Sequence, residues 1–207
     1  MDDGCCVNWE FVFDQLAEHG FVVVDDYMSK EAYLATDARF TVLINKNELE
    51  KAGVGDQRNF LINAAVRGDY ISWINRENPD EAAFLDNMTE LRGLINEHCW
   101  LNLSAQEFHF AAYPPLSFYS RHFDQFKENT NRKISFVLYM NEAWLPEHAG
   151  ELRMYTIAGT EDLAPIRNRL VLFRSDVLEH EVLLTQVERK SITGWFLHKD
   201  PELLFLD

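Results

Sequence analysis

Two side chains that can bind one metal ion lie two residues apart, at His122 and Asp124. In a β-strand, residues at this spacing point to the same face, so both side chains can reach one ion. A third ligand can come from His180, on a later predicted strand. Two imidazoles and one carboxylate leave three octahedral positions open, an arrangement that suits iron(II) binding a co-substrate and dioxygen together.

This spacing alone is a weak signal. With seven histidines and 34 acidic residues in the chain, about one such pair is expected by chance. A second pair, His198-Lys199-Asp200, has no later histidine to complete a site. We expect His148 to face solvent in a loop. We expect His98 to lie on the surface of a helix and His109 to be a structural residue of a strand. Structural histidines therefore remain an alternative to a metal site.

A buried cation is predicted on the strand that follows these residues. Alternation places Arg189 and Thr193 on one face of that strand. If this face is buried, Arg189 needs an anionic partner, and a dicarboxylic acid can supply one because a guanidinium pairs with a carboxylate through two hydrogen bonds. Thr193 and the inward-facing Tyr139 can each add a hydrogen bond. The alternative for Arg189 is a surface salt bridge.

The N-terminal half of the chain is predicted to support the site. Residues 1–100 predict one buried strand and three helices, at Phe21–Val24, Trp9–His19, Lys30–Asn45 and Pro79–Cys99. The segment around residues 46–66 is polar and weakly periodic, so we expect a long loop of the kind that often covers a site.

Residues 101–207 predict the core that carries the site, with strands at Glu107–Tyr113, Ser117–Phe123, Lys133–Asn141, Glu151–Tyr155, Arg169–Phe173, Glu179–Leu184 and Ser191–Leu197. Helices followed by closely spaced strands predict a single α+β domain over residues 1–207, a double-stranded β-helix (jelly roll) buttressed by the N-terminal helices. Within Lys133–Asn141, we expect Ile134 and Phe136 to pack on the helices, and Val137 and Tyr139 to face the barrel interior.

Composition narrows the choice of partners. The formal charge of −15 and a pI near 4.8 disfavour a nucleic-acid substrate, since such a surface repels phosphates. The longest apolar stretches are too short to span a bilayer, so we expect no membrane association. The acidic N-terminus does not resemble a signal peptide, and an odd number of cysteines, two of them adjacent, fits a reducing compartment. We therefore expect a cytoplasmic protein.

The order and local sequence of these motifs resemble the 2-oxoglutarate-dependent dioxygenases, and in particular the prolyl hydroxylases of the hypoxia-inducible-factor type and their bacterial relatives. The likeness extends from about Val66 to Phe196. It is carried by Val66–Ile74, Ala112-Tyr113-Pro114, Tyr119–Asp124, Leu138–Asn141, Gly150–Arg153, and Arg189 with Thr193 and Trp195.

The resemblance implies a role for each matching residue. The iron ligands would be His122, Asp124 and His180. The pocket for 2-oxoglutarate would be formed by Arg189, Tyr139, Thr193 and Tyr113. The substrate side of the site would include Arg132, Arg67, Asp69 and Trp195, with the Arg67-Gly68-Asp69 turn closing the covering loop.

The implied reaction is hydroxylation of a prolyl residue in a flexible protein loop, with dioxygen as oxidant and 2-oxoglutarate decarboxylated to succinate. Ascorbate is a candidate accessory reductant, and a translation factor is one candidate target. Two alternatives remain, a hydroxylase of a free amino acid or other small molecule and a catalytically silent jelly-roll binding module. The presence of His122, Asp124, His180 and Arg189 together argues against a silent module.

Overall fold

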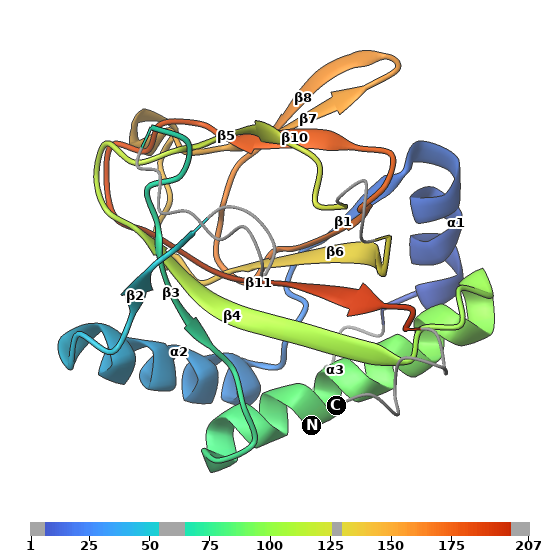
Figure 1. Cartoon of the computed structure of the whole chain (residues 1–207), viewed down its shortest axis with the longest axis horizontal. Helices are drawn as coiled ribbons and strands as arrows, with labels where there is room; N and C mark the ends of the chain where they lie inside the picture. Colours follow the sequence, from blue (N-terminus) through green and yellow to red (C-terminus); the bar gives the residue numbers. More distant parts are fainter. Residues whose placement is uncertain (1–6, 54–64, 126–129, 200–207) are drawn as a thin grey trace.

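Two facing antiparallel sheets form the centre of the molecule (Figure 1), seen in a computed structural model that describes residues 7–53, 65–125 and 130–199. The major sheet has seven strands in the order β1-β9-β6-β11-β4-β3-β2. Their bounds are β1 (Phe21–Val24), β2 (Glu50–Lys51), β3 (Tyr70–Trp73), β4 (Ala105–Tyr113), β6 (Arg132–Tyr139), β9 (Leu170–Arg174) and β11 (Arg189–Leu197). The minor sheet has the order β5-β10-β7-β8, with β5 (Tyr119–His122), β7 (Leu152–Thr156), β8 (Gly159–Leu163) and β10 (Glu179–Val182).

Three α-helices lie outside the sheets, at α1 (Trp9–His19), α2 (Lys30–Asn45) and α3 (Pro79–Cys99), with a short 3₁₀ helix, η1, at Pro146–His148. Side chains of Asn8, Ser29 and Asn78 cap the N-termini of the α-helices by accepting backbone N–H groups. Gly20 ends α1 in the left-handed region, at φ +79°, where glycine pays no steric penalty. Figure 1 shows α2 and α3 along the outer face of the major sheet. These helices confirm the predicted bounds and the α+β architecture.

Apolar side chains form two separate clusters, one on each face of the major sheet. The first lies between the sheet and the helices and includes Ile134 and Phe136. The second lies between the two sheets and includes Val137 and Tyr139. The predicted alternation along β6 is therefore confirmed. One face of the major sheet therefore lines the space between the two sheets.

Three short strands were not predicted. The first two, β2 and β3, extend the edge of the major sheet, so the N-terminal half contributes to the sheet as well as supporting it. The third, β8, spans Gly159–Leu163, where only Leu163 is buried. These strands gave no signal in the sequence, because short strands that bury few apolar residues show no alternation.

Part of the predicted covering loop is described. Residues 46–53 include β2, whereas residues 54–64 lie outside the described part of the chain, as do Cys5, Cys6 and residues 200–207. Among the described residues, no helix is long and apolar enough to cross a membrane.

Candidate active site

The three predicted metal ligands meet between the sheets, at one end of β5 and β10. His122 on β5 and His180 on β10 are directly opposite one another across the antiparallel pair. Asp124 follows the end of β5, and its Oδ1 lies 3.5 Å from Nε2 of His122 and its Oδ2 3.6 Å from Nε2 of His180. One ligand atom from each residue lies within 4.8 Å of the other two. One ion can therefore contact all three.

The backbone sets the orientation of both imidazoles. Nδ1 of His122 lies 2.7 Å from the carbonyl oxygen of Ser120, and Nδ1 of His180 lies 3.3 Å from that of Leu178. A carbonyl only accepts hydrogen bonds, so each Nδ1 must carry the proton. In a neutral ring with this tautomer, Nε2 carries the lone pair that a metal ligand requires, and each Nε2 lies on the side of Asp124.

Asp124 and His180 have the charge states that a divalent cation needs. Burial alone would raise the pKa of Asp124, but the His180 and His122 imidazoles and a 2.7 Å hydrogen bond from Ser135 Oγ hold it below its usual range. Burial lowers the pKa of His180 to about 4, so this ring is neutral at pH 7. Ser135 is in turn 2.8 Å from Ser175 Oγ. An ionised carboxylate and a neutral imidazole fit iron(II).

Arg189 is buried between the sheets, only 1% exposed. Its Nε donates to the carbonyl oxygen of Gly150 at 3.0 Å and its Nη1 to Ser191 Oγ at 3.4 Å, while the guanidinium carbon lies 5.0 Å from the ring centroids of Tyr113 and Tyr139. Within the described part of the chain, no carboxylate forms an ion pair with Arg189, and the Tyr139 hydroxyl has no hydrogen-bond partner. A buried cation beside an unpaired hydroxyl is suited to an anionic ligand.

The alternative of a surface salt bridge for Arg189 is wrong. The next residue, Lys190, makes the surface contact instead, with its Nζ 2.8 Å from Asp37 on α2. The orientation follows from the strand, because neighbouring residues of β11 face opposite sides of the major sheet.

The predicted substrate residues fall into two groups. The Arg132 guanidinium carbon lies 3.4 Å from the Trp195 ring centroid, and Arg132 also donates to Glu107 and to the carbonyl oxygen of Asp124. This pair therefore adjoins the metal-binding residues. Thr193, which was predicted to bind the co-substrate, is half-buried on the same strand as Trp195, directly opposite Val137.

Arg67 and Asp69 bind each other. Asp69 is fully buried, and its two carboxylate oxygens accept from Arg67 at 2.6 and 2.8 Å. Arg67 also lies over the ring of Tyr119, at 4.8 Å from its centroid. Asp69 therefore holds the Arg67 guanidinium in place from a fully buried position.

Three residues near the site were not predicted to serve it. Ser135 anchors Asp124, Tyr119 stacks on the His122 ring at 3.7 Å, and His109 is buried on the inner face of β4. The inward position of Ser135 was visible in the alternation of its strand. Nothing in the spacing distinguished His109 from a structural histidine.

The remaining histidines do not form a second metal site with the cysteines and acidic residues that the structure describes. His98 is exposed and His148 half-buried. Nδ1 of His198 lies 2.8 Å from the carbonyl oxygen of Asn102, and Asp200 lies outside the described residues.

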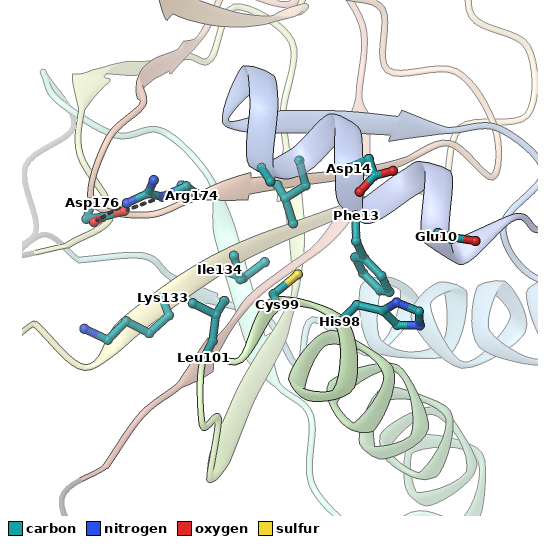
Figure 2. Close-up of a pocket in the computed structure, with 12 residues that line it drawn as sticks. Glu10, Phe13, Asp14, His98, Cys99, Leu101, Lys133, Ile134, Arg174 and Asp176 are labelled. Atoms are coloured by element: carbon teal, nitrogen blue, oxygen red, sulfur yellow. Dashed lines mark hydrogen bonds and ion pairs between the residues drawn. The ribbon is translucent and has the colours of Figure 1, made fainter.

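A pocket of about 440 Å³ opens elsewhere, between α1, the end of α3, and strands β6 and β9 (Figure 2). Phe13, Leu101 and Ile134 supply its apolar lining, beside the free thiol of Cys99. Ile134 belongs to the helix-facing core, so this pocket lies across the major sheet from the metal-binding residues. Burial raises the pKa of the Cys99 thiol, which makes it a poor nucleophile.

Comparison with known proteins agrees with this geometry. Residues 108–197 match the 2OG-Fe(II) oxygenase superfamily. Egl nine homolog 1 from Homo sapiens is 26% identical over 92% of this chain, and the chain spans only 47% of that protein's length. A solved Pseudomonas putida prolyl-4-hydroxylase is 36% identical, with a TM-score of 0.84 over 92% of this chain and 99% of that one. A Trichoplax adhaerens prolyl hydroxylase, solved with a peptide fragment of the hypoxia-inducible factor oxygen degradation domain, shares the fold at 23% identity and a TM-score of 0.82.

Members of this superfamily use iron(II) and 2-oxoglutarate, and both fit the residues found here. The two imidazoles and the carboxylate suit iron(II), and Arg189 with the Tyr139 hydroxyl suits the far carboxylate of 2-oxoglutarate. The identity across nearly the whole length of the Pseudomonas putida enzyme extends the match well beyond the core strands. This chain therefore belongs to the 2OG-Fe(II) oxygenase superfamily.

Proposed function

We propose that this chain hydroxylates a prolyl residue in a protein, using iron(II), 2-oxoglutarate and dioxygen. The observation that carries the proposal is the placement of the His122-Asp124-His180 triad and the buried Arg189 in the same space between the sheets. The 36% identity with a prolyl-4-hydroxylase supports proline as the target residue.

Each residue has a defined task in this reaction. Bound iron(II), with 2-oxoglutarate and dioxygen, supplies an oxidative decarboxylation that yields succinate and carbon dioxide and adds one oxygen atom to a C–H bond. The triad holds the ion, and Ser135 fixes the carboxylate of Asp124. Arg189 anchors the far carboxylate of the co-substrate and so fixes its position relative to the metal.

The nature of the protein partner is a further part of the proposal. The net charge of −15 favours a neutral or basic protein over a nucleic acid. A loop of a translation factor is one candidate target. We also propose a cytoplasmic location, supported by three cysteines of which two are adjacent.

Succinate release tests the proposal directly. Purified protein with iron(II) and 2-oxoglutarate should release succinate faster with a proline-containing peptide than with free proline, and mass spectrometry should find one added oxygen atom on the prolyl residue. An Asp124→Ala variant provides the background rate. Stimulation by free proline alone would instead establish the small-molecule alternative.

A further inference from the structure

His109 lies on the face of β4 that lines the space between the sheets. Its neighbours Phe108 and Phe110 point the other way, into the core beneath the helices. Ala111 and Tyr113, two and four residues further along, belong to the cluster between the sheets. Because strand residues alternate, His109 shares the inner face with Ala111 and Tyr113.

The neighbours of His109 place it between Thr193, which is assigned to the co-substrate pocket, and the surface of the molecule. Thr193 on β11 and Trp73 on β3 are directly opposite it on its two sides. Its ring centroid lies 5.0 Å from that of Trp73 and 5.7 Å from that of Trp195. Trp73 is 50% exposed, so this side of the site reaches the surface.

The His109 ring has polar atoms with no protein partner. The residue is 1% exposed, and neither Nδ1 nor Nε2 forms a hydrogen bond with any described residue. Burial, with Arg67 and Arg132 nearby, lowers the pKa of His109 well below its usual value, against the opposing effect of Asp124. The ring is therefore neutral and offers one donor and one acceptor. Unpaired buried groups of this kind are costly and call for an explanation.

We infer that His109 is a substrate-binding residue, whose imidazole N–H donates a hydrogen bond to the main-chain carbonyl of the prolyl substrate. This inference rests on the proposed prolyl hydroxylation. A prolyl residue has no N–H group, so at that residue the main chain can be recognised only through its carbonyl oxygen. A ring donor beside the half-exposed Trp73 meets this requirement.

The co-substrate is a less suitable ligand for His109. Its far carboxylate is assigned to Arg189, which lies directly opposite Tyr113. Tyr113 lies four positions beyond His109, a distance of about 13 Å along the strand. His109 therefore lies well away from Arg189 and is opposite Thr193 instead.

A matched pair of substitutions tests the inference with the same proline-containing peptide. His109→Met keeps an unbranched side chain of similar size but removes both polar atoms, and His109→Gln keeps a donor and an acceptor. We expect the KM for the peptide to rise about tenfold in His109→Met and to stay within about threefold of wild type in His109→Gln. The KM for 2-oxoglutarate and the visible absorption of the anaerobic iron(II)–2-oxoglutarate complex should not change in either variant.

Several outcomes would overturn the inference. They are an unchanged peptide KM in His109→Met, an equal loss in both variants, or a His109→Met protein that fails to fold, since the last two would give His109 a purely structural role. If wild type hydroxylates no prolyl peptide, the proposed function fails and the inference fails with it. An active wild type with an unaffected His109→Met variant rejects the role of His109 alone.

Discussion

His122 and His180 lie directly opposite one another across strands β5 and β10, with ring centroids 4.3 Å apart. The geometry of two of the three metal ligands is therefore set by the pairing of two strands. A slip of one residue in this register would turn one of the imidazoles to the outer face of the minor sheet. Asp124 follows His122 so closely that the same register also positions the carboxylate.

Removal of one of these imidazoles should abolish the metal site. Anaerobic addition of iron(II) and 2-oxoglutarate to wild type should give a weak visible charge-transfer band, and His180→Ala should give none because a two-ligand site binds iron(II) poorly. The matched control is His148→Ala, which removes a half-buried histidine on η1. A full band in His180→Ala would contradict the assigned ligand set.

Tyr139→Phe separates a role in binding from a role in folding. Among the described residues, none forms a hydrogen bond with the buried Tyr139 hydroxyl, so its removal should not lower the free energy of unfolding. If the hydroxyl binds the far carboxylate of 2-oxoglutarate, the KM for 2-oxoglutarate should rise roughly tenfold, the value of one hydrogen bond to a charged group. Denaturant unfolding and initial-rate kinetics measure the two effects.

The Arg189→Met variant provides a stronger form of the same test. It replaces a buried cation with an apolar side chain, and we expect a rise of about a hundredfold in the KM for 2-oxoglutarate. A variant of either residue with a wild-type KM would show that the co-substrate carboxylate is bound elsewhere.

The sequence predicted that the three metal-binding residues come together and that Arg189 and Tyr139 face inward, because strand alternation is a local property. His122 and Asp124 share a face whatever the rest of the fold does. The partnerless state of His109 was not predictable in this way. It depends on Trp73 and Trp195, which reach the ring from β3 and β11, and one of these strands has no apolar alternation of its own.

The Arg67–Asp69 pair shows a second limit of the sequence. The resemblance assigned both residues to the substrate side, but residue types alone do not reveal that two charges two residues apart bind each other. In the folded chain Asp69 is fully buried and both of its oxygens accept from Arg67. The pairing follows from the burial of Asp69 in the folded chain, because a buried charge is costly unless an opposite charge lies beside it.

Ser135→Ala should weaken iron binding without removing a ligand. The Ser135 hydroxyl donates to Oδ2 of Asp124, which fixes the orientation of the carboxylate. Loss of such an outer contact lowers metal affinity by about ten- to a hundredfold. Anaerobic iron(II) titration measures the change, with Ser120→Ala as a control, because the hydrogen bond between Ser120 and His122 uses the backbone carbonyl of Ser120. Equal iron(II) affinities in wild type and Ser135→Ala would show that Ser135 does not support the metal site.

The stability of the metal-free protein should fall as the pH decreases from about 6.5 to 4, and His180 should be one cause. Burial lowers the pKa of His180 from 6.5 to about 4 in the folded state, so across this interval the unfolded chain binds a proton that the folded chain does not. The free energy of unfolding should then decrease by about 1.4 kcal/mol per pH unit, a total of about 3 kcal/mol. This contribution is fully present above pH 6.5 and lost by about pH 4.

Urea unfolding of metal-free wild type and His180→Asn at pH 7, 6, 5 and 4 measures this contribution to the free energy of unfolding. We expect a shallower pH dependence in His180→Asn, whereas parallel curves would show that His180 is not neutral in the folded protein.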